Sequence, residues 1–429
     1  MEKVLNGTAS AAHAEKKEYV MDMTEGNSLK LIMKFSIPLL IGNLFQQVYS
    51  VVDSVVVGRH LGANALGGVG SVGMISFLFF SLCSGMAAGI GVVISKYFGA
   101  KQDDMVKKAI ANAVYVILAV GILMSVLGFC LTGPLIFLII ASVINAVLDI
   151  ILVVYLDMGV AGAAYATAFS QIVSGVGSII YAVKTNSYFR LSREDFAVDH
   201  RIMKEDFRIG IPMAVQTSMI SVSCSLLQAL INGYGPAVMA AYTATGKVEG
   251  IVFQPFSSLG LALSTFAGQN MGARRYDRIR KAVWQAECIT IALSAVLFAA
   301  ILLFRENIVS FFVTDEEVIR LGAKGMLISG SMYVALGTIY TLRGALNGMG
   351  DVVFSMINGF LEVGGRVVFA LVLMYVINMG FWGIWYTNIF TWVVIALTAA
   401  VRLVVYLKKV QRSSARNTTD DIKKLNPEE

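Results

Sequence analysis

The chain has 429 residues, of which 57% are hydrophobic and 14% are charged, and its mean hydropathy is +0.72. A soluble protein carries about 25% charged residues, so this composition excludes an ordinary soluble domain. The net charge of +6 falls mainly between apolar runs, where it indicates membrane topology rather than nucleic-acid binding.

Apolar runs of roughly the ~20 residues that a membrane-spanning helix needs recur along the whole chain, without the period-two alternation of a transmembrane barrel. They predict an all-α polytopic membrane protein with eleven helices. In chain order the predicted helices cover residues 30–57, 66–97, 109–131, 134–156, 161–183, 209–233, 238–267, 283–304, 319–346, 353–377 and 382–407.

These helices form two bundles joined by a basic linker. The predicted parts are an N-terminal segment (1–28), an N-terminal bundle (29–183), a linker (184–208), a C-terminal bundle (209–410) and a tail (411–429). The tail is polar, and we expect it to be disordered.

Positive charge gathers in a few short segments. Beside the linker, the basic residues are Lys101, Lys107, Lys108, Arg274, Arg275, Arg278, Arg280, Lys281, Lys408, Lys409 and Arg412. By the positive-inside rule, these segments and both termini are expected to be cytoplasmic, in a protein of the plasma (inner) membrane.

The second bundle repeats the first. Three matches carry the repeat: Ile37-Pro38 with Ile211-Pro212, Gly99-Ala100-Lys101 with Gly272-Ala273-Arg274, and Gly159, Gly162 and Tyr165 with Gly380, Gly383 and Tyr386. A duplicated apolar chain is typical of a transporter whose binding site lies between the halves.

The first copy is shorter than the second. Gly99 and Gly159 are 60 residues apart, whereas Gly272 and Gly380 are 108 apart, so the first half lacks about 48 residues. To keep the basic segments on one side, residues 109–156 must cross the membrane a net odd number of times. Either one segment there is re-entrant or strained, or the chain is an internally deleted copy.

Three segments resemble the multidrug and toxic compound extrusion (MATE) antiporters, in particular their bacterial DinF-like branch. They are IPLLIGNLFQQVYSVVDSVVVG (37–58), FAGQNMGARRYD (266–277) and LNGMGDV (346–352), and the resemblance spans about residues 28–410. It implies twelve helices in two bundles of six, a central cavity, and export of cationic or amphipathic compounds in exchange for protons or sodium ions. The chain departs from this pattern by lacking the family's fourth helix.

The first predicted helix carries one polar stripe. At intervals of three and four residues it contains Asn43, Gln46 or Gln47, Ser50, and Asp53 or Ser54, which therefore share a face. A carboxylate within the bilayer is costly and is retained mainly where it faces water, a cation or a partner. We expect Asp53 to be the cation-coupling residue, as the resemblance also implies; alternatively it lies near the helix end and pairs with Arg59.

Further candidates follow along the chain. Asn145 and Asp149 are four residues apart on one helix face and extend the predicted cation site, unless they only pack helices together. Gln228 and Glu249 are predicted to face the cavity from the second half. Glu362 and Arg366 have the favourable spacing of a helical ion pair, which we expect to be structural.

No cofactor, catalytic or metal site is predicted. Cys83, Cys130, Cys224 and Cys288 lie in apolar runs without metal spacing, and the sequence contains no nucleophile–base or zinc motif. The expected partners are small drug-like molecules and the lipid bilayer, with no nucleic acid, and a monomer is the default expectation.

The sequence thus predicts a secondary active multidrug efflux antiporter driven by protons or sodium ions. Two alternatives remain at this stage. One is a lipid-linked oligosaccharide flippase of the same superfamily, which would use Lys247, Arg343 and Arg366 to hold phosphate. The other is a degenerate copy that does not transport, as the 48-residue deficit suggests.

Overall fold

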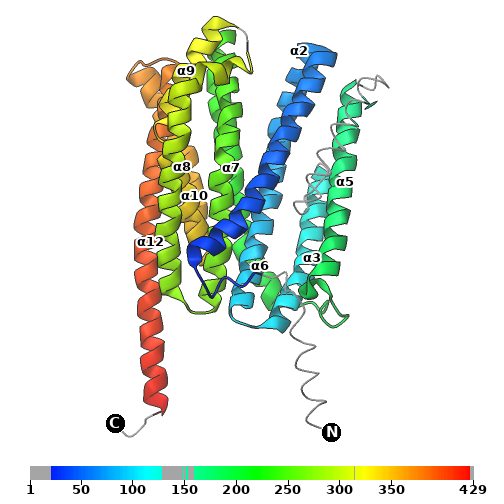
Figure 1. The fold of residues 1–429 in the computed structure, drawn as a ribbon, viewed down its shortest axis with the longest axis vertical. Helices are drawn as coiled ribbons and strands as arrows, with labels where there is room; N and C mark the ends of the chain where they lie inside the picture. The colour runs from blue at the N-terminus through cyan, green and yellow to red at the C-terminus, as the bar shows by residue number, and fades with distance from the viewer. Residues whose placement is uncertain (1–20, 128–147, 149–150, 153–158, 314, 426–429) are drawn as a thin grey trace.

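The computed structural model describes residues 21–127, 148, 151–152, 159–313 and 315–425, and their regular structure is entirely helical (Figure 1). The elements are α2 (Ser28–Gly99), α3 (Asp103–Leu127), α5 (Gly159–Thr185), η2 (Ser187–Phe189), α6 (His200–Ile231), η3 (Asn232–Tyr234), α7 (Pro236–Gly272), α8 (Tyr276–Ser310), α9 (Glu316–Gly330), α10 (Tyr333–Gly348), α11 (Val352–Leu371), η4 (Val372–Val376) and α12 (Trp382–Leu425). Among these residues, seven helices are long and apolar enough to cross a membrane, or eight if the bent pair α9 and α10 forms one span. The predicted all-α polytopic fold is confirmed.

α2 is one run of helical residues that reverses direction. A straight helix of its 72 residues would be roughly 108 Å long, far more than the ~30 Å apolar core of a bilayer. Both of its ends lie beside the end of α7: Ile32 packs in one core with Phe266, and Gly99 packs against the backbone of Gln269. α2 therefore contains two antiparallel spans, arm 1 (Ser28–Gln47) and arm 2 (Phe80–Gly99), which correspond to the predicted helices 30–57 and 66–97.

The repeat is visible as reciprocal contacts between the halves, here the N-terminal half (28–185) and the C-terminal half (200–410). A Cβ atom on Gly99 would overlap the carbonyl oxygen of Gln269, and one on Gly272 would overlap the carbonyl oxygen of Lys96. Each contact maps onto the other by the repeat, which is the self-complementary pattern of a two-fold interface. The next matched residues, Lys101 and Arg274, both adopt φ of 57°.

The first turns of each half pack on the other half. Ile32 of arm 1 lies in a core with Phe266 of α7 and Ile279 of α8. Met203 and Phe207 of α6, in turn, pack on a core that contains Ile90 of arm 2. The halves are therefore interlocked at this end of the molecule rather than simply stacked side by side.

The basic segments gather at one end of the bundle, called here the basic end. The loop that follows arm 2 meets the loop that follows α7 at Gly99 and Gly272. The linker lies beside them, because Tyr188 donates a 2.7 Å hydrogen bond to Asp103 at the start of α3. α12 joins them through Arg402, whose Nε donates to Asp351 at 2.6 Å. This shared end is what the charge pattern predicts.

α3 and α5 run in opposite directions, since the start of α3 and the segment after α5 meet at Asp103 and Tyr188. Figure 1 shows both helices along the long axis on the side away from α8 and α12. The end of α3 (Leu127) and the start of α5 (Gly159) therefore both lie at the end of the bundle opposite the basic end. This placement agrees with a net odd number of membrane crossings by residues 109–156. Most of the predicted helix 134–156 lies outside the described residues.

One predicted helix is broken. Residues 319–346 form α9 and α10 rather than one helix, and the two axes differ by 49°. The break follows Gly330 and Ser331, and Met332 has φ −121° and ψ 23°, which is not helical. Adjacent glycine and serine residues are a common cause of such a kink.

Two predicted boundaries are also corrected. The tail was predicted to be disordered from residue 411, but α12 continues to Leu425; this stretch has no glycine or proline before Pro427 and places Asp420 four residues before Lys424, a spacing that supports a helix. The stretch between α5 and α6 is 186–199, which lies within the predicted linker 184–208. α6 begins early because the Asp199 side chain caps it, accepting from Arg201 N at 2.9 Å.

Candidate functional site

The polar stripe of arm 1 faces the C-terminal half. Asn43 Nδ2 donates to Ser258 Oγ of α7 at 3.1 Å, and Gln47 Nε2 lies 3.4 Å from the carbonyl oxygen of Gly250. Gln46 is half-buried. Two of the predicted cavity residues therefore lie at the interface between the halves, the place where duplicated transporters bind substrate.

The predicted cation site falls largely outside the described side chains. Ser50 and Asp53 lie within α2, but their side chains are not among those that the structure describes. Asn145 and Asp149 lie outside the described residues altogether. Their roles remain predictions from the sequence.

The repeat partner of Asn43 also contacts the opposite half, though at a different position along the facing helix. Thr217 of α6 donates from Oγ1 to the carbonyl oxygen of Ser81 in arm 2 at 2.7 Å. The Ser81 and Ser221 hydroxyl groups are also 2.7 Å apart. Sequence reasoning missed Ser81, because a helical serine commonly hydrogen-bonds its own backbone and gives no sign of a partner on another helix.

A buried charged cluster joins α10 and α11. Glu362 accepts hydrogen bonds from Arg343 Nη2 at 2.8 Å and from Arg366 Nη2 at 3.2 Å. Arg343 is 2% exposed, Glu362 is 4% exposed and Arg366 is 6% exposed. Arg343 Nε is further fixed by Asn358 Oδ1 at 2.7 Å. The predicted ion pair is thus present within a three-residue cluster with one excess positive charge.

Two more helices approach this cluster. Arg366 Nη1 donates to Cys224 Sγ of α6 at 3.3 Å, and the half-buried Glu249 of α7 is close enough to Arg366 for their charges to interact. Glu249 therefore lies near the charged cluster. Gln228 instead donates to Asn232 at 3.0 Å, four residues along its own chain.

Glu287 of α8 is a buried carboxyl group that the sequence reasoning did not select. Its Oε2 accepts a hydrogen bond from Thr338 Oγ1 of α10 at 2.9 Å. Its other oxygen is buried and has no hydrogen-bond partner among the described residues. The sequence does carry a signal for this residue, because Glu287 is a single acid near the start of the apolar run 283–304.

The side chains that the structure describes contain no group of three or more His, Cys, Asp or Glu residues that could hold a metal ion. What this part of the chain offers is a polar interface between two halves, with buried charge in the C-terminal half. Such an arrangement can bind a small molecule or an ion between the halves and couple it to their relative movement.

Comparison with known proteins agrees with this architecture. The profile of the MatE family matches residues 38–188 and again 212–372, once in each half. The probable multidrug resistance protein YoeA of Bacillus subtilis (strain 168) is 24% identical over an alignment of 407 positions, which covers 82% of this chain and 88% of that protein. The probable multidrug resistance protein NorM of Thermotoga maritima is 21% identical over an alignment of 449 positions, which covers 92% of this chain and 96% of that protein.

Solved structures give the same fold. A MATE protein crystallised in complex with MaL6 superposes with a TM-score of 0.84 at 19% identity, covering 91% of this chain and 99% of that one. An outward-facing multidrug resistance MATE family transporter of the MOP superfamily gives 0.82 at 20% identity, covering 93% and 100%. Because the family profile matches most of the sequence and matches it twice, this chain belongs to the MatE family of multi-pass membrane transporters.

Proposed function

We propose that the protein is a secondary active antiporter that exports cationic or amphipathic small molecules in exchange for protons or sodium ions. The observation that carries the proposal is the contact of Asn43 and Gln47, on the polar stripe of arm 1, with α7 of the opposite half. A substrate or ion bound beside this stripe would touch both halves. The names of the relatives, which refer to multidrug resistance, support the same substrate class.

Transport would use a relative movement of the two halves. Gly99 and Gly272 hold the halves in contact at the basic end, so access from that side requires these contacts to open. A bound ion or substrate changes the balance between the closed and open states only by binding one of them more tightly. The basic end is assigned to the cytoplasm of the plasma (inner) membrane by the positive-inside rule.

Asp53 is proposed as the coupling residue, with Asn145 and Asp149 completing the cation site. Asp53 follows Gln47 and Ser50 on the stripe, and an acid at membrane depth is costly unless it binds something. Gln46, Gln228 and Glu249 are proposed to line the substrate path with Asn43. No cofactor is proposed beyond the coupling ion.

The test is dye export by purified protein in liposomes, first under a proton gradient and then under a sodium gradient. Asp53→Asn should abolish export driven by the effective gradient. Asp104, an exposed acid in the first turn of α3, serves as the matched control, and Asp104→Asn is expected to retain export. Coupled export that persists in Asp53→Asn would overturn the coupling role. Inserted, folded protein that exports under neither gradient would support the degenerate copy instead.

The flippase alternative receives no specific support from the described residues. It needs several free basic side chains for a diphosphate, but Arg343 and Arg366 share the carboxylate of Glu362, which leaves the exposed Lys247 of α7 as the remaining candidate. Export therefore remains the function that the geometry favours.

A further inference from the structure

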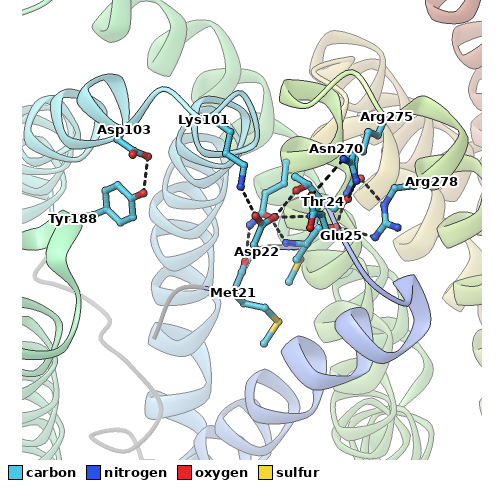
Figure 2. Close-up of polar contacts among 12 residues, drawn as sticks. Met21, Asp22, Thr24, Glu25, Lys101, Asp103, Tyr188, Asn270, Arg275 and Arg278 are labelled. Atoms are coloured by element: carbon cyan, nitrogen blue, oxygen red, sulfur yellow. Dashed lines mark hydrogen bonds and ion pairs between the residues drawn. The ribbon is translucent and has the colours of Figure 1, made fainter. Parts of the chain in front are cut away.

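The segment before α2 is ordered and crosses between the two halves. Residues 21–26, called here the strap, lie at the basic end between the loop after arm 2 and the loop after α7, as Figure 2 shows. Met23 is 0% and Thr24 is 2% exposed, so the strap is packed into the structure rather than resting on its surface.

The C-terminal half holds the strap mainly through its backbone. Gln269 Oε1 accepts from Met23 N at 2.6 Å, and Asn270 Nδ2 donates to Met23 O at 3.0 Å. Two arginines donate to strap carbonyl groups, Arg275 to Thr24 O at 2.6 Å and Arg278 to Gly26 O at 2.8 Å.

Apolar packing strengthens the same attachment. The Met23 side chain lies in the core that contains Phe266 and Ile279 of the C-terminal half, and Ile32 of arm 1 lies in it too. The strap and the first turns of arm 1 therefore form one unit with α7 and α8.

Apart from the chain's own continuation into arm 1, the ion pair that joins the strap to the N-terminal half among the described residues is Asp22–Lys101. Lys101, in the loop after arm 2, contacts the Asp22 carboxylate, and Thr24 orients that carboxylate by donating from its backbone N at 2.8 Å. The Lys101 and Asp22 side chains are 64% and 34% exposed. This pair is more accessible to water than the buried Met23 and Thr24 contacts on the other side, where the Arg275–Glu25 ion pair is also exposed.

We propose that the strap is a latch that holds the basic end closed, and that the Asp22–Lys101 ion pair is the contact that breaks when this end opens. The strap would then stay on the C-terminal half while the loop after arm 2 moves away with Gly99. The inference rests on the proposed function, because it supposes that the halves separate at the basic end during transport.

Two cross-links distinguish a latch from a passive segment. Both are made in protein whose native cysteines are replaced by serine, with a short bifunctional thiosulfonate reagent that dithiothreitol removes. Linking Asp22→Cys to Lys101→Cys joins the strap to the N-terminal half and should stop dye export until the link is reduced. Linking Thr24→Cys to Arg275→Cys joins the strap to the C-terminal half and should leave export at the uncross-linked level. Export unaffected by both links, or stopped by both, would overturn the proposal.

A second measurement does not depend on transport. Spin labels on Asp104→Cys and Arg280→Cys, both exposed at the basic end, report the distance between the halves. Asp22→Asn should increase the fraction of molecules with a long distance, and the charge exchange Asp22→Lys with Lys101→Asp should reverse the increase.

The two readouts separate the proposals. An unchanged distance distribution in Asp22→Asn would refute the latch even if export continues. A changed distribution in protein that exports nothing would refute the proposed function and leave the latch in place.

Discussion

At the scale of single residues, Glu362 is the side chain whose substitution should lower the free energy of unfolding most. It compensates the charge of both Arg343 and Arg366 in a buried site. Glu362→Gln would leave two buried cations without their acid, and breaking a buried pair costs about 3–5 kcal/mol. We expect a loss of unfolding free energy of that size, measured by denaturant unfolding in detergent.

Glu287→Gln provides the matched control for this change. Glu287 is also a buried acid but is bonded to Thr338 rather than to a cation, so its neutral substitution should leave stability nearly unchanged. Equal losses in the two variants would contradict the view that charge compensation is the role of Glu362.

The Asp22–Lys101 pair predicts how the strap responds to pH. Partial burial alone would raise the pKa of Asp22, but hydrogen bonds from Lys101 and Thr24 outweigh it and hold this pKa below its usual value. The hydrogen bond with Asp22 also raises the pKa of Lys101. A carboxyl group with a lowered pKa stabilises the docked state above its undocked pKa and loses that effect as pH falls through the docked pKa.

The strap contact should therefore hold at neutral pH and weaken only below about pH 4. The spin-label distance between residues 104 and 280 should lengthen in that acidic range. The Asp22→Asn variant, which has no carboxyl group to protonate there, should show no such transition. A transition near neutral pH in the native pair would assign the response to other groups facing the strap, among them Glu25, Arg275 and Arg278.

At the scale of elements, close packing of arm 2 on α7 depends on two glycines. A methyl group on Gly99 would meet the backbone of Gln269, whereas one on Gly91, in the same arm, would meet nothing within 4 Å. Forcing extra atoms into a packed contact costs about 1–3 kcal/mol. Gly99→Ala should lower the melting temperature in detergent, and Gly272→Ala should do so to a similar extent because the contacts are reciprocal.

Gly91→Ala is the control within the same arm. Alanine is favoured over glycine in a helix interior by about 0.5–1 kcal/mol, so this variant should be neutral or slightly more stable. If Gly99→Ala behaved in the same way, the close approach of arm 2 to α7 would not hold the halves together.

The elements also show where sequence reasoning succeeds. Apolar length located most spans, because a bilayer demands about 20 apolar residues for each helix. It could not show that residues 319–346 are broken at Ser331 and Met332, since a kink leaves the apolar run intact. Polarity alone suggested a disordered tail, while α12 continues to Leu425.

At the scale of the whole molecule, the gathering of basic loops at one end predicts a single orientation. A cysteine at Arg274, at the basic end, should react with an impermeant maleimide only in permeabilised cells. A cysteine at Gly233, which follows α6 at the opposite end and has open space around it, should react in intact cells. Both variants are compared in protein without native cysteines, and the reverse labelling pattern would place the basic end outside.

The sequence by itself determined the membrane class, the internal repeat, the family and the position of the basic segments, because these depend on composition and spacing along the chain. Only the tertiary structure decided that Arg343 shares Glu362 with Arg366 and that α2 turns back on itself. It also decided that the first turns of each half pack on the other half and that residues 21–26 bridge the two halves at the basic end. These features depend on which faces of distant helices meet. The rotation and crossing of packed helices set that, and no local pattern of residues records it.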